Sequence, residues 1–264
     1  MNFFFGLKTD KISSEIKIPK FNYSNLYYFK NHKVFKATPN KDKWKISSLN
    51  CIEKNDFFLI DNNQIDNNSI YFLANDNEIK QFSSHTDLNQ LENFNKFTDN
   101  DPVEFRANLK LTLKYGGCSS YQSEYSYLMT KKDGNILSPL NSLFNIDADE
   151  NILVFRNISF KPEIKKFDLY LISLNENKVL NKYDIYSNTT NFFEIDKKFI
   201  KQDVFIFTVG LIGIPLYLSI KEKHLSFEHT HPPHHYILSN DRFKIISNLK
   251  KKFKKIADEN AFKK

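Results

Sequence analysis

The chain has 264 residues, of which 41% are hydrophobic and 26% are charged. These fractions are typical of globular proteins and exclude a wholly disordered chain. The length suits one large or two modest domains with a real hydrophobic core. Aromatic residues make up 15% of the chain, mostly Phe and Tyr, which favours strands over helices.

The net charge of +7 raises the question of nucleic-acid binding. Most of the basic charge is Lys distributed along the whole chain, and Arg occurs only at Arg106, Arg156 and Arg242. Recognition of bases and phosphates usually depends on the bidentate guanidinium of Arg. We therefore do not expect a nucleic-acid partner.

The two cysteines, Cys51 and Cys118, form neither a metal-ligand spacing nor a disulfide framework. Residues 1–8 are apolar for only a few positions and lack the basic and long apolar regions of a secretion signal. We expect a soluble protein of the reducing cytoplasm. The apolar run Val204–Ile220 is shorter than a bilayer requires, and two glycines and a proline interrupt it. It predicts two buried strands joined by a turn.

The first predicted region, 1–98, consists of short strands separated by Asn and Asp turns. A short helix over Leu88–Phe97 leads to a boundary at 98–102. The predicted strands of this region are Leu26–Phe29, Lys33–Ala37, Trp44–Leu49, Phe57–Ile60 and Ile70–Ala74.

The second predicted region, 99–238, is an antiparallel β-sandwich or barrel. Apolar and polar residues alternate from Val103 to Tyr115, which predicts a strand with one buried face. The glycine pair 116–117 permits a reversal, and Ser120–Thr130 returns as the second strand of a hairpin. The further strands predicted are Ile152–Phe160, Phe167–Leu174, Val179–Ile185, Phe192–Ile195, Val204–Val209 and Pro215–Ile220.

The third region, 239–264, predicts a basic amphipathic helix capped by Ser239, Asn240 or Asp241. Its predicted apolar stripe is Phe243, Ile246, Leu249, Phe253 and Ile256, with Lys244, Lys250, Lys251, Lys252, Lys254 and Lys255 around it. One interpretation is a helix packed on the sheet with a solvated basic face. The other is a helix that contacts an anionic membrane surface or a protein partner.

A histidine-dense segment precedes this helix and is the principal candidate site. His229 and His231 are two residues apart, so in an extended chain both imidazoles point to one face. With His235 and the carboxylate of Glu228 they could hold a divalent metal such as zinc, iron or manganese. The other interpretation is a rigid surface loop that binds no metal. A third is that these histidines act as a general base or a pH-sensitive contact.

The spacing His-x-His-x3-His at His229, His231 and His235 resembles part of the first metal motif of the cupin family. In that family a carboxylate usually takes the third place, which His235 occupies here. The glycine expected six positions before the first histidine is Lys223, and no second motif follows. We assign no family from this resemblance.

The hairpin offers a second candidate site. Tyr121 and Tyr125 are expected on one face of a strand and Glu124 on the other, an arrangement that resembles a carbohydrate-binding surface. The alternative is ordinary cross-strand packing. Arg106 and Glu124 are candidate orienting groups for a small polar substrate.

Two functions follow from these features. In the first, the protein binds a divalent metal, which activates water or polarises a substrate in a reaction that the sequence does not identify. In the second, it is a non-catalytic binding or assembly module for a carbohydrate, protein or membrane surface. The sequence leaves open whether the protein is an enzyme.

Overall fold

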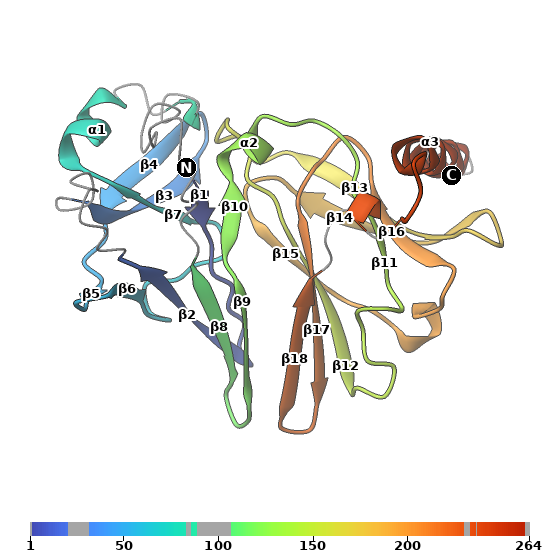
Figure 1. Ribbon diagram of the computed structural model, residues 1–264, viewed down its shortest axis with the longest axis horizontal. Helices are drawn as coiled ribbons and strands as arrows, with labels where there is room; N and C mark the ends of the chain where they lie inside the picture. The colour runs from blue at the N-terminus through green and yellow to red at the C-terminus, as the bar shows by residue number, and fades with distance from the viewer. Residues whose placement is uncertain are drawn as a thin grey trace. The chain divides into compact units, whose positions relative to one another are not determined.

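The computed structural model describes residues 2–20, 32–82, 86–88, 107–229, 233–235 and 237–261. These residues form a mainly β protein with antiparallel sheets and a C-terminal helix, as the sequence predicts (Figure 1). They divide into two compact units. Unit 1 comprises 1–131, 158–164 and 188–190, and unit 2 comprises 132–157, 165–187 and 191–264.

Unit 1 contains two five-stranded sheets. The order of the first sheet is β10 (Glu124–Ser126), β1 (Asn2–Phe4), β7 (Ile70–Ala74), β3 (Lys33–Asn40) and β4 (Lys43–Ser48). The order of the second is β5 (Ile52–Glu53), β6 (Phe57–Ile60), β2 (Ile12–Pro19), β8 (Asn108–Leu113) and β9 (Cys118–Gln122). Two short helices, α1 (Asp76–Gln81) and α2 (Tyr127–Thr130), complete the described elements of this unit.

The predicted hairpin is confirmed in β8 and β9. Leu109, Leu111 and Leu113 are buried while the residues between them are not, because successive side chains of a strand point to opposite faces. The turn closes where the Leu113 amide donates to the Gly117 carbonyl over 3.0 Å. The alternation of apolar and polar residues along the sequence therefore predicted this hairpin correctly.

The returning chain leaves the second sheet at Ser123, which lies between β9 and β10. Ser123 is fully buried, and its hydroxyl oxygen accepts a hydrogen bond from the Phe5 amide over 3.0 Å. The same hydroxyl donates to the Phe5 carbonyl. The chain then pairs with β1 in the first sheet and continues as α2. The single strand predicted over Ser120–Thr130 is therefore wrong, because a buried serine redirects the chain.

Unit 2 contains two four-stranded sheets. The order of the first is β11 (Leu137–Pro139), β16 (Val204–Thr208), β13 (Lys166–Ser173) and β14 (Lys178–Tyr186). The order of the second is β15 (Thr190–Glu194), β12 (Glu150–Arg156), β17 (Ile214–Lys221) and β18 (His224–His229). A 3-10 turn, η3 (Lys197–Phe199), precedes β16, and another, η4 (Pro233–His235), follows β18.

One apolar cluster contains side chains from both sheets of unit 2. Leu169 and Ile206 come from the first sheet, whereas Leu153, Phe155 and Tyr217 come from the second. At roughly 25 cal/mol per Å² of apolar surface removed from water, this cluster is a main source of the unit's stability.

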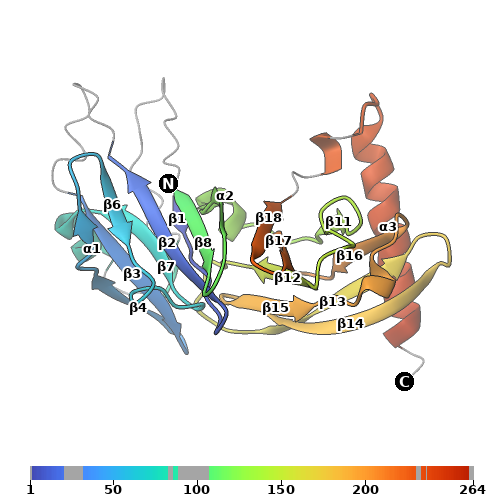
Figure 2. The same ribbon diagram turned by 90° about the horizontal axis from the view of Figure 1, so that it is seen from below.

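The C-terminal helix α3 (Arg242–Ala261) packs on the other side of the first sheet of unit 2. Phe253, Ile256 and Ala257 are buried against side chains of β13 and β16. The predicted stripe holds from Ile246 onward, but Phe243 is 60% exposed. The reason is visible in Figure 2, where the N-terminal part of α3 extends beyond the strands of the sheet.

Most strands from β3 to β17 occupy predicted segments, whereas β1, β2, β5, β11 and β18 were not predicted. The apolar run Val204–Ile220 forms two strands, β16 and β17, as expected. No helix among the described residues is long and apolar enough to cross a bilayer. The predicted strand Leu26–Phe29, most of the predicted helix Leu88–Phe97 and the predicted boundary at 98–102 lie outside the described residues.

Candidate functional site

The histidine-dense segment begins at the end of an edge strand. His229 is the last residue of β18, is half-buried and stands opposite Leu216 of β17. Glu228 is exposed and, as its neighbour on the strand, points to the opposite face. The strand geometry therefore does not bring the carboxylate of Glu228 and the imidazole of His229 together.

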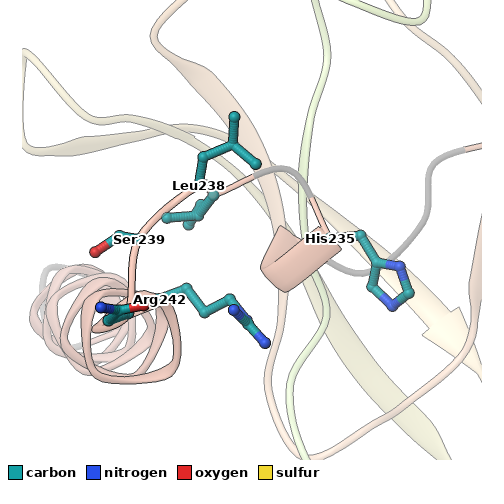
Figure 3. A pocket seen from close by; sticks show the side chains of 6 residues that line it. His235, Leu238, Ser239 and Arg242 are labelled. Carbon is teal, nitrogen blue, oxygen red and sulfur yellow. The ribbon is translucent and has the colours of Figure 1, made fainter.

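His235 lies at the end of η4 and is exposed. It borders an open pocket of about 760 Å³, whose other lining residues are Ile237, Leu238, Ser239, Asn240 and Arg242. Figure 3 shows that Leu238, Ser239 and Arg242 gather beside the start of α3, whereas the imidazole of His235 lies apart and points away from them. The pocket thus does not combine His235 and Arg242 around one ligand.

The metal prediction is not tested by these positions. His231, the central predicted ligand, lies outside the described residues. Within the described ranges, no group of three His, Cys, Asp or Glu side chains could hold a metal ion. Metal binding through His229, His231 and His235 stays a prediction from their spacing.

The structure separates the candidate residues of the hairpin. Tyr121 is half-buried in β9, and burial, with a contribution from the charge of Glu124, raises the pKa of its hydroxyl. The carboxylate of Glu124 accepts a hydrogen bond from the Ala107 amide over 2.8 Å. Tyr125 pairs with Phe3 in β1 and has no exposed surface. It therefore offers no ring face to a sugar. Arg106 lies outside the described residues.

A different surface is formed by the outward side of α3. At about 100° per residue, Lys244, Lys251 and Lys255 lie within roughly 40° of one another around the helix axis. All three are exposed. We call these three residues the lysine stripe. It runs along the helix opposite the buried side chains of Phe253 and Ile256.

The charge of α3 is strongly unbalanced. Its 20 residues include seven basic and two acidic side chains, a net charge of +5. Within the helix Lys255 pairs with Glu259 over 3.8 Å on the exposed surface, where such pairs contribute little to stability. Lys250 is turned inward instead: it donates to the Asn135 carbonyl over 2.6 Å, and burial lowers its pKa.

Exposed apolar side chains gather at the start of the same helix. Leu238 is 98% exposed, Phe243 60% and Ile245 44%. We call these three residues the apolar tip. The sequence interpretation missed the tip because it assigned Phe243 to the core stripe and gave Leu238 no role. The only indication of the tip in the sequence was the run from Leu238 to Ile245, which places three large apolar residues near Arg242 and Lys244.

Comparisons with protein-family models, with curated proteins and with solved structures found no match to this chain.

Proposed function

We propose that the protein is a non-catalytic binding module that docks on an anionic surface through α3. The observation that carries this proposal is the lysine stripe, three exposed ammonium groups aligned on the outward side of a helix with a net charge of +5. A cation near an anionic surface contributes about 1 kcal/mol, and the contribution falls off over roughly 8–10 Å.

The helix is held in place before any partner binds. Phe253 has no exposed surface and contacts the rings of Phe205 and Phe207, with centroid distances of 5.6 and 5.8 Å. A preformed basic face avoids most of the entropy cost of ordering a segment on binding. This supports α3 as a docking element rather than a segment that folds on its partner.

The test reverses the charge of the stripe in the full chain. The variant Lys244→Glu/Lys251→Glu/Lys255→Glu is compared with Lys132→Glu/Lys201→Glu/Lys223→Glu, whose lysines are also exposed in unit 2. Both variants change the net charge equally. We measure elution from immobilised heparin and binding to vesicles that contain phosphatidylserine.

We expect the stripe variant to lose at least about 100-fold in affinity, from roughly 1 kcal/mol per lost lysine, while the control loses only a few-fold. Equal losses in the two variants would show that overall charge, not α3, determines binding. Failure of the natural protein to bind either anionic surface would reject the proposal.

Four other predictions from the sequence remain proposals in addition to the docking of α3. Divalent-metal binding by His229, His231 and His235 is supported by their spacing. Carbohydrate or small-polar-ligand binding at the hairpin is supported by the partly exposed ring of Tyr121 in β9. A sandwich arrangement is supported in unit 2 by the apolar cluster that contains residues of both sheets. A cytoplasmic location is supported by the cysteine usage.

A further inference from the structure

We propose that the anionic surface is a lipid bilayer and that the apolar tip, Leu238, Phe243 and Ile245, inserts into it. This inference rests on the proposed function, because the lysine stripe supplies the first attraction to the anionic headgroups. The tip adds the apolar contact that a membrane offers and a purely charged partner does not.

The apolar tip is a local concentration of exposed apolar surface. Nine large apolar side chains are exposed among the described residues, and three of them fall between positions 238 and 245. The other six are distributed over the rest of the described chain: Ile52, Tyr115, Leu128, Ile146, Ile164 and Tyr186. Clustered exposed apolar residues beside cations indicate an interaction site, whereas single ones are ordinary.

The directions of the tip side chains favour lipid over a flat protein face. At about 100° per residue, Phe243 and Ile245 lie roughly 160° apart around the helix, on either side of Lys244. No single flat partner can cover both sides of the turn. Acyl chains can reach both sides, because this end of α3 extends beyond the sheet (Figure 2).

The charges around the tip fit a headgroup layer. Arg242 and Lys244 are exposed and adjoin the apolar side chains, and the guanidinium of Arg242 lies 5.1 Å from the ring centroid of Phe243. Long basic side chains can place their charge at the headgroups while their stems and neighbours reach the acyl boundary. The lysine stripe continues the same charge along the helix.

The experiment uses the full chain and vesicles of phosphatidylcholine with or without phosphatidylserine. The tip variant is Leu238→Ser/Phe243→Ser/Ile245→Ser. Its matched control is Leu128→Ser/Ile146→Ser/Ile164→Ser, which removes three exposed apolar side chains elsewhere. Heparin elution is measured for each protein, and thermal unfolding checks that both variants are folded.

We expect the tip variant to elute from heparin with the natural protein but to bind phosphatidylserine vesicles at least about tenfold more weakly, because burial of apolar side chains in the bilayer is lost. The control variant should bind like the natural protein. A second measurement uses Phe243→Trp: the natural Trp44 is 1% exposed, so a blue shift on adding anionic vesicles reports on position 243.

The outcomes separate the two proposals. Unchanged vesicle binding by the tip variant, or no blue shift at position 243, overturns the insertion while the proposed function stands. Retention on heparin without binding to anionic vesicles also overturns it and favours an acidic protein or another polyanion as the partner. Failure of the natural protein on both heparin and vesicles rejects the proposed function itself.

Discussion

The ring of Phe253 in α3 stands nearly edge-on to the ring of Phe207 in β16, with 5.8 Å between their centroids and 76° between their planes. Both side chains have no exposed surface. Edge-to-face aromatic pairs contribute about 0.5–1.5 kcal/mol beyond the area that they bury. This pair fixes the part of α3 that lies on the sheet and so determines which helix residues face outward.

Phe253→Ala should therefore destabilise unit 2 by about 3–5 kcal/mol, because it removes a buried ring and leaves a cavity beside Phe205 and Phe207. Phe243→Ala in the same helix should change stability by less than about 0.5 kcal/mol, since Phe243 is 60% exposed. Urea unfolding followed by circular dichroism measures both. Equal effects of the two substitutions would contradict the described packing of α3.

Gly213→Ala should also destabilise the protein. A Cβ at Gly213 would lie 2.6 Å from the Arg156 carbonyl oxygen, closer than real contacts allow, and 2.5 Å from the Phe155 ring. Because the backbone of β12 has to move, we expect a loss of roughly 1–3 kcal/mol, measured as a lower midpoint of urea unfolding. The comparison is Gly210→Ala, where the nearest atom is 3.9 Å away but φ is +71°. There the cost should be limited to about 1–2 kcal/mol of backbone strain.

The carboxylate of Asp66 should make unit 1 sensitive to acid. Burial raises its pKa, but hydrogen bonds from Lys36 and Ser69 outweigh this effect, so the net pKa is lowered. A carboxylate with a lowered folded pKa contributes stability above its unfolded pKa of about 4, and the contribution is lost as the pH falls through the folded value.

Asp66→Asn should therefore cost about 1 kcal/mol near pH 7, a small value because the side chain of Asp66 is 39% exposed. Near pH 2 the natural and variant proteins should have similar stability. Thermal unfolding across the pH range measures the difference. A gap that persists at low pH would mean that the loss arises from packing and not from charge.

The metal proposal predicts near-stoichiometric zinc, iron or manganese in protein purified without a histidine tag. His229→Ala/His231→Ala should abolish that content, whereas His224→Ala, at the far end of β18, should leave it unchanged. Elemental analysis measures all three samples. Absence of metal from the natural protein, with an unchanged melting temperature after metal addition, would rule out this proposal.

The sequence predicted the elements in which apolar residues recur with the period of a strand or a helix, because such elements bury one face. The alternation of Leu109, Leu111 and Leu113 located β8, and the helical spacing of Ile246, Phe253 and Ile256 located the packed side of α3. It missed β1, because three consecutive Phe residues carry no alternation. β2 does alternate, from Ile12 to Ile18, and could have been predicted.

The candidate sites were harder to predict because they depend on neighbours distant in sequence. Tyr125 was expected to share one face of a single strand with Tyr121, yet at Ser123 the chain passes to the first sheet, where Tyr125 pairs with Phe3. Phe243 has helical spacing, yet it is 60% exposed near the start of α3, whose N-terminal part extends beyond the strands of its sheet (Figure 2). Only tertiary structure tells these exposed and buried positions apart.

Because Phe5 and its hydrogen-bond partner Ser123 are far apart in the sequence, β1 is synthesised long before its partner β10. Strand β1 obtains its partner Tyr71 only after some 67 further residues have been made, and its partners in β10 only after some 120. At about 5–20 residues per second, the Phe3–Phe5 segment is made roughly 6 to 24 seconds before β10. During that interval the edge of β1 that β10 will cover has no partner, and unpaired strand edges favour aggregation of incompletely folded chains.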